Sequence, residues 1–183
     1  KGVVVSIDHY ITELHNILRG HADAFEHATA AVKAVKQAGL VSAISVCATK
    51  AFIDGGHMGP YLEFAKDMGV HFVQVLYPRS IGHYEGQNVL LEEKHITILE
   101  AFFKQVNHSK EYKKYPILLY HGYHQRRVGC FAGSRSVYID SAGDVHACPF
   151  CHTSSFNIIQ LIREGETNIP KKENACPQFK KIA

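Results

Sequence analysis

Four of the five cysteines lie in the last third of the chain, at a spacing that suits a metal centre. Cys130-x12-Gly143-x4-Cys148-x2-Cys151 is followed by Cys176. Four thiolates can hold a zinc ion tetrahedrally or a [4Fe-4S] cluster. The spacing favours a metal site and leaves open which metal fills it.

A predicted hairpin explains how distant cysteines could meet. The segment SVYIDSAGDVHAC, residues 136–148, has two strand-like halves around a turn at 141–143, where Gly143 is free to take a positive φ. Such a turn would bring Cys130 close to Cys148. A thioredoxin-type redox pair is a weaker alternative, since that motif normally opens a helix after a strand.

Composition narrows the class of protein. Apolar residues make up 46% and charged residues 20% of the 183 residues, and the formal net charge is +3. Such a mild charge gives no reason to expect nucleic acid or a membrane surface as a partner. The first segment is too polar for a secretion signal, so we expect a cytoplasmic protein, where clustered cysteines bind metal more often than they form disulfides.

Strand-like and helix-like segments alternate through the first part of the chain. This alternation is typical of a parallel sheet with right-handed crossovers. We expect a βαβαβα domain over residues 1–114 and a smaller cysteine-rich domain over 115–183. Three units do not close a barrel, and the chain begins at Lys1 directly on a strand, so we expect a piece of a longer protein. The expected strands are 2–7, 41–49 and 70–76, and the expected helices are 24–39, 61–69 and 89–106.

Polar residues stand at or near the ends of these strands. Ser6 and Asp8 lie at the C-terminal end of the first strand, where barrel enzymes place active-site groups, although Asp8 could simply cap the loop. Ser45 and Gln74 are polar within apolar runs and need partners, and Gln74 is the better candidate for a cofactor or substrate contact. Thr49, at the end of the second strand, could line the same site.

Other side chains that could do chemistry have simpler interpretations. Cys47 lies in an apolar strand and is expected to behave as a small hydrophobic residue. Nothing in the sequence fixes the geometry of the histidines, so most are expected to be ordinary loop residues; they are His9, His15, His57, His83, His121 and His124.

Residues 3–49 resemble the middle of a radical S-adenosylmethionine (SAM) enzyme barrel. The matching features are a strand ending in Ser-Ile-Asp, a His-x3-Arg-Gly segment, an Ala-Gly-Leu turn and a strand ending in Thr. The C-x12-G-x4-C pattern with the following CPFC is similar to the auxiliary-cluster domain of the SPASM or twitch type. The resemblance implies the later half of a parallel (β/α) partial TIM-type barrel followed by a small α+β cysteine-rich hairpin domain.

The resemblance also implies cofactors and roles. Ser6, Asp8, Arg19 and Gln74 would contact SAM, and the auxiliary [4Fe-4S] cluster, rather than zinc, would be held by Cys130, Cys148, Cys151 and Cys176. A simpler interpretation of Arg19 is a surface salt bridge.

The Cys-x3-Cys-x2-Cys motif that binds the SAM-cleaving cluster in this family is absent and would precede Lys1. We therefore expect the complete protein, not this piece alone, to be an oxidoreductase or maturase. It would modify a peptide or protein through a 5′-deoxyadenosyl radical, with flavodoxin or ferredoxin as the reductant. The alternative is a non-catalytic α/β module with a structural zinc ribbon, acting as a binding or scaffold protein.

Overall fold

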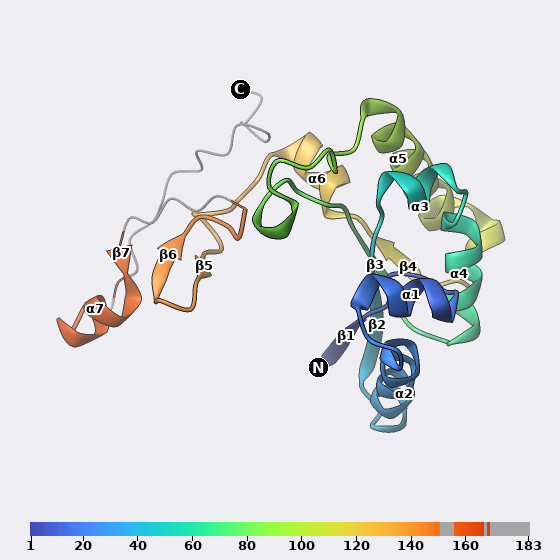
Figure 1. Cartoon of the computed structure of the whole chain (residues 1–183), viewed down its shortest axis with the longest axis horizontal. Helices are drawn as coiled ribbons and strands as arrows, with labels where there is room; N and C mark the ends of the chain where they lie inside the picture. Colours follow the sequence, from blue (N-terminus) through green and yellow to red (C-terminus); the bar gives the residue numbers. More distant parts are fainter. Residues whose placement is uncertain (151–155, 167, 169–183) are drawn as a thin grey trace. The chain divides into compact units, whose positions relative to one another are not determined.

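The computed structural model describes residues 1–150, 156–166 and 168 (Figure 1). The chain divides into two compact units, Lys1–His121 and Gly122–Ala183. The helices of the described part include none that is long and apolar enough to cross a membrane.

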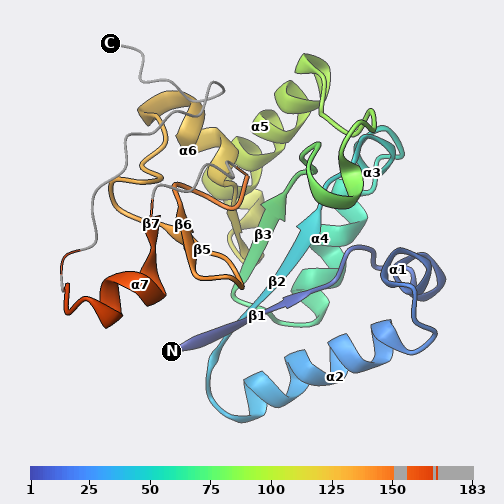
Figure 2. The same cartoon turned by 60° about the vertical axis from the view of Figure 1, so that its left-hand side comes forward.

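The first unit is built on a parallel sheet of four strands. The strands lie side by side in chain order, with β1 at one edge (Figure 2). They are β1 (Gly2–Ser6), β2 (Val41–Cys47), β3 (Phe72–Leu76) and β4 (Ile117–Leu119). The first three confirm the predicted strands within a few residues at their ends. The short fourth strand was not predicted.

Helical segments connect consecutive strands. α1 (Thr12–Arg19) and α2 (Ala24–Gln37) join β1 to β2, and α3 (Lys50–Asp54) and α4 (Met58–Asp67) join β2 to β3. The 3-10 turn η1 (Gly82–Tyr84), α5 (Glu93–His108) and the 3-10 turn η2 (Lys110–Tyr112) lead to β4. Gly39, just after α2, has a φ of +67°, the left-handed conformation that favours glycine at the end of a helix.

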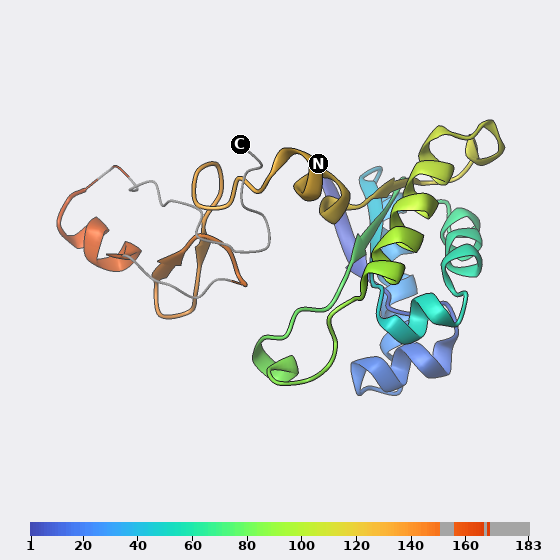
Figure 3. The ribbon, with the colours of Figure 1, turned by 90° about the horizontal axis from the view of Figure 1, so that it is seen from above.

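One face of the sheet forms the core. Ile44, Val46, Val73, Val75 and Leu118 are at most 3% exposed on this face. Figure 3 shows α4 and α5 on the same side of the sheet, and Phe25 of α2 meets Phe64 of α4 at a ring-centroid distance of 5.8 Å. The helices therefore bury the alternate, β-branched residues of the strands.

Ser6, Ser45 and Gln74 lie on the opposite face of the sheet, whereas the buried Ser42 shares the core face with Ile44. Ser6 pairs with Ser45, and Ser45 with Gln74, so the three lie in one row across the sheet. Because side chains alternate along a strand, this row faces away from the core residues Ile44 and Val73.

The second unit contains a small antiparallel sheet. It is formed by β5 (Tyr138–Ile139), β6 (Asp144–His146) and β7 (Phe156–Asn157), followed by α7 (Ile158–Arg163). The hairpin predicted around Gly143 is present in shorter form, with Gly143 at a φ of +87°. Asp140 stabilises its turn, since one carboxylate oxygen accepts the backbone N–H groups of Ala142 and Asp144 at 2.9 and 3.0 Å.

The two compact units divide between His121 and Gly122. The strand β4 belongs to the first unit because it pairs with β3, with Ile117 opposite Phe72. α6 (His121–Val128) begins at this division.

Candidate functional site

Ser6 and Ser45 are in contact at the carboxyl end of β1 and β2. Their hydroxyl oxygens lie 3.1 Å apart. Ser45 is buried, and this contact supplies the partner that a buried polar side chain requires. Gln74 is next to Ser45 in the register and is half-buried. The structure thus brings together three of the polar strand residues noted in the sequence.

Asp8 lies two residues beyond β1 and contacts three residues in two other elements, α1 and β2. Its Oδ2 lies 2.8 Å from Nη2 of Arg19, and its Oδ1 accepts the backbone N–H of Cys47 at 3.1 Å. Its own N–H donates to Nδ1 of His15 at 3.0 Å. Asp8 therefore ties the ends of β1 and β2 to α1, which is more than the loop cap expected as its simpler role.

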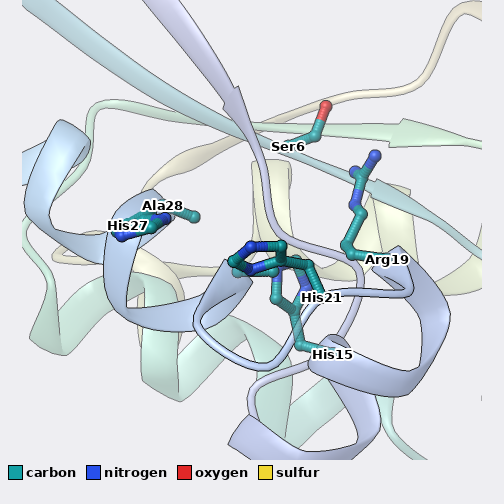
Figure 4. Close-up of a pocket in the computed structure, with 7 residues that line it drawn as sticks. Ser6, His15, Arg19, His21, His27 and Ala28 are labelled. Atoms are coloured by element: carbon teal, nitrogen blue, oxygen red, sulfur yellow. The ribbon is translucent and has the colours of Figure 1, made fainter.

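Arg19 is the last residue of α1, and Gly20 follows it with a φ of +66°. Arg19 also lines a cavity of about 390 Å³ together with Ser6, His15, His21, Ala24, His27 and Ala28. Figure 4 shows its guanidinium and the Ser6 hydroxyl on the same side of this cavity. The cavity thus combines a hydroxyl with a cation, a pair of groups suited to a carboxylate.

Two histidines expected to be ordinary loop residues are buried. His15 is 1% and His9 is 4% exposed. Burial lowers the pKa of His15, and nearby Arg19 lowers it further, while Asp8 acts in the opposite direction. The Nδ1 of His15 accepts the N–H of Asp8, so the neutral ring carries its proton on Nε2. His9 lies in the connection between β1 and α1, and His15 lies within α1, which has only eight residues and so shows no clear helical period in the sequence.

A second cavity, of about 270 Å³, opens beside the carboxyl end of β1. Its lining includes Asp8, Cys47 and Thr49. Thr49 therefore lies at the carboxyl end of the strands, as expected. Its hydroxyl accepts the backbone N–H of Phe52 at the start of α3. Cys47 is half-buried, and burial, reinforced by Asp8, raises its pKa to about 11. A thiol with this pKa is almost entirely protonated at neutral pH, in keeping with the hydrophobic role expected for it.

Tyr61 holds the backbone beneath these cavities. Its hydroxyl donates to the carbonyl of Ile7 at 2.6 Å, and the side chain is 2% exposed. Burial, with the nearby Asp8 carboxylate, raises its pKa well above the ordinary value, so the hydroxyl stays a donor. This anchor from α4 fixes the segment that carries Ser6 and Asp8.

The predicted cysteine site lies only partly within the described residues. Cys130 and Cys148 are both half-buried, and Cys148 follows β6 by two residues. Nε2 of Gln125 lies 4.0 Å from Sγ of Cys130. Cys151 and Cys176 lie outside the described residues. Within residues 1–150, 156–166 and 168, no group of three or more His, Cys, Asp or Glu side chains is placed to hold a metal ion.

Comparisons by sequence give no relatives. No protein-family profile matches the chain, and no curated protein matches it either.

Comparison of the structure with solved structures gives a clear fold likeness. A crystal structure of SuiB from Streptococcus suis bound to S-adenosylmethionine superimposes with a TM-score of 0.63 at 13% identity, over 87% of this chain and 40% of that one. A second SuiB crystal structure gives 0.62 at 14% identity, over 87% and 41%. The chain thus spans about two fifths of the length of SuiB, and the two proteins share their fold over that part.

Proposed function

We propose that this chain is part of a radical SAM enzyme of the SPASM or twitch type that modifies a peptide or protein. The observation that carries the proposal is the cavity at the carboxyl end of β1, where Ser6 and Arg19 lie together. The fold shared with SuiB, a protein crystallised with S-adenosylmethionine, supports the same conclusion. The Ser-Ile-Asp and Arg-Gly elements of the sequence provide the two side chains.

The residues that line this cavity fit the amino-acid end of SAM. The guanidinium of Arg19 would pair with the carboxylate, and the hydroxyl of Ser6 would hydrogen-bond to the same part of the cofactor. The cavity volume of about 390 Å³ lies within the usual range for small-molecule sites. When cleaved reductively, SAM supplies the 5′-deoxyadenosyl radical that abstracts hydrogen from a substrate.

Asp8 would act through Arg19 rather than on the cofactor. Its carboxylate is already engaged by the guanidinium and by the N–H of Cys47. These two contacts fix the direction in which Arg19 extends from the end of α1. Gln74, in the same row as Ser6 and Ser45, would contact cofactor or substrate from the open face of the sheet.

We further propose that Cys130, Cys148, Cys151 and Cys176 hold an auxiliary [4Fe-4S] cluster. Two of these residues, Cys130 and Cys148, are described, and both are half-buried. Bound there, the cluster would accept or relay an electron or anchor the substrate. Flavodoxin or ferredoxin is the proposed reductant, and the cytoplasm is the proposed location.

Calorimetric titration of the chain with SAM tests the first part of the proposal. Saturable binding is expected, weakened about tenfold or more by Arg19→Gln because a charge-assisted hydrogen bond is lost. Arg163→Gln, on the exposed end of α7, is the matched control and is expected to bind normally. Absence of binding, or equal affinities for the two variants, contradicts the assignment of this cavity to SAM.

Anaerobic reconstitution with iron and sulfide tests the cluster. The expected product is brown, with about four irons per chain. Cys148→Ser and Cys151→Ser are expected to lose iron, whereas Cys47→Ser, in the strand β2, keeps it. A colourless protein with one zinc ion would instead favour the structural zinc ribbon and the binding or scaffold role.

A further inference from the structure

The positive charge in the cavity that Ser6 and Arg19 line is already partly balanced. Nη2 of Arg19 lies 2.8 Å from Oδ2 of Asp8. A carboxylate ligand beside Arg19 is attracted by the guanidinium and repelled by the carboxylate of Asp8. Hydrogen bonds from neutral donors add to binding without a charge that Asp8 could offset. A carboxylate bound in this cavity therefore depends strongly on the neutral donors of its walls.

His15 is a neutral donor in the wall of this cavity. It lies four residues before Arg19 on α1, so the two side chains share one face of the helix (Figure 4), and both line the cavity. Nδ1 of His15 accepts the backbone N–H of Asp8 at 3.0 Å, and because a backbone N–H can only donate, the ring proton is on Nε2. Burial and the nearby Arg19 hold the pKa of His15 below its ordinary value against the opposing effect of Asp8, so the ring is neutral at pH 7.5.

Nε2 is the open end of an otherwise buried ring. The side chain of His15 is 1% exposed. Within the described part of the chain, its Nε2 has no hydrogen-bond partner, yet solvent reaches this nitrogen, unlike the shielded Nε2 of His9. The small accessible surface of the ring is thus at Nε2, and since His15 lines the cavity, this N–H is directed into it. Buried donors nearly always have an acceptor, and here the acceptor comes from the contents of the cavity.

The two other histidines of the lining are placed differently. His21 and His27 are exposed, so water can hydrogen-bond to their rings whether or not a ligand is present. A hydrogen bond that replaces one to water contributes little, whereas a buried donor without a protein partner contributes more when a ligand supplies its acceptor. His15 is therefore the histidine whose N–H favours a bound ligand most.

We propose that His15 is a third binding residue for the carboxylate of the ligand in this cavity, with its Nε2–H donating beside Arg19 and Ser6. That the ligand is SAM rests on the proposed function. The hydrogen bond itself does not, since the carboxylate of any amino acid can accept it. His15 then has two roles, because Nδ1 holds the backbone of Asp8, the partner of Arg19, while Nε2 reaches the ligand.

Two substitutions separate these roles in a calorimetric titration of the whole chain with SAM at pH 7.5. His15→Asn keeps an acceptor near Nδ1 and removes the donor, so binding is expected to weaken about tenfold. His15→Gln places an amide N–H near the position of Nε2 and gives up the Asp8 contact, so it is expected to keep most of the affinity. If His15 only positioned Asp8, the order of the two variants would be reversed. His108→Asn, at an exposed position of α5, is the matched control with unchanged affinity.

A second measurement needs no variant. The imidazole ¹⁵N signals of the unchanged chain are expected to show His15 protonated on Nε2, and this signal is expected to move with L-methionine but not with L-methioninamide, which has no carboxylate. If SAM does not bind but L-methionine moves the signal, the carboxylate contact stands and only the assignment of the cavity to SAM fails. The proposal is overturned if His15→Asn binds SAM as tightly as the unchanged chain, if His15→Gln binds no better than His15→Asn, or if neither SAM nor L-methionine moves the Nε2 signal.

Discussion

Asp8 and Arg19 form an ion pair of 2.8 Å that joins the two cavities at the carboxyl end of β1. Asp8 lines the smaller cavity and Arg19 the larger one. A ligand that engages the guanidinium therefore acts on the same carboxylate that borders the second cavity. This pair gives the two cavities a direct physical connection.

Two substitutions separate the contributions of the two contacts of Asp8, the ion pair with Arg19 and the hydrogen bond from Cys47. Asp8→Asn removes the charge that pairs with Arg19 but keeps an acceptor for the N–H of Cys47, whereas Asp8→Ala removes both. We expect Asp8→Ala to lower the free energy of unfolding by about 2 kcal/mol and Asp8→Asn by less than about 1 kcal/mol, since Arg19 is partly exposed. Urea denaturation measures both. Equal losses would mean that the Cys47 contact contributes nothing.

Replacing Gly55 and Gly59 by alanine gives a matched pair of variants with opposite expected effects on stability. A Cβ on Gly55 would lie 2.7 Å from Cδ2 and Nε2 of His57 and 2.9 Å from the carbonyl of Ala51, whereas a Cβ on Gly59 would meet nothing within 4 Å. Gly55→Ala is therefore expected to cost about 1–3 kcal/mol by overpacking. Gly59→Ala, inside α4, is expected to gain up to about 1 kcal/mol of helix stability. Thermal unfolding of the two variants checks the opposite signs, and a loss in both would contradict the packing described for His57.

Alkylation of Cys47 should depend steeply on pH. Its pKa is raised from 9.0 to about 11, so little thiolate exists at pH 8 and the rate of reaction with iodoacetamide should climb through pH 11. Because the Asp8 carboxylate contributes to this rise, Asp8→Asn is expected to shift the profile to lower pH. Mass spectrometry of the Cys47 peptide follows the rate, and the urea-unfolded chain provides the reference. A folded profile that coincides with the unfolded one would contradict the buried position of this thiol.

Stability should fall as the pH is lowered through 6.5 and below. The pKa of His9 and the pKa of His15 are both lowered in the folded chain, so below pH 6.5 the unfolded chain binds more protons than the folded one. The stability these neutral rings contribute is present above pH 6.5 and is lost as pH decreases toward their lowered pKa values. His15→Asn keeps an acceptor near Nδ1 without titrating, and is expected to flatten the slope. Urea unfolding midpoints between pH 7.5 and 5 measure this dependence of stability on pH, with His108→Asn as the control.

The first three strands and the longer helices α2, α4 and α5 could be predicted because their periodicity is local, whereas the shorter α1, α3 and α6 were missed. β1, β2 and β3 are runs of β-branched residues, and Gly39 marks a left-handed turn that few other residues adopt. β4 was missed because three residues, Ile117–Leu119, are too few to show a period. Only their pairing with β3 makes them a strand.

The sequence by itself determined which chemical groups stand at the ends of β1 and β2, namely Ser6, Asp8 and Thr49, because strand direction fixes where each strand stops. Only the tertiary structure decided that Asp8 pairs with Arg19, and that His9 is buried with its Nε2 unsatisfied. These properties depend on how α1, α3 and α4 pack around the strand ends. Burial and partner choice arise from contacts between segments distant in the chain, which no local pattern of residues encodes.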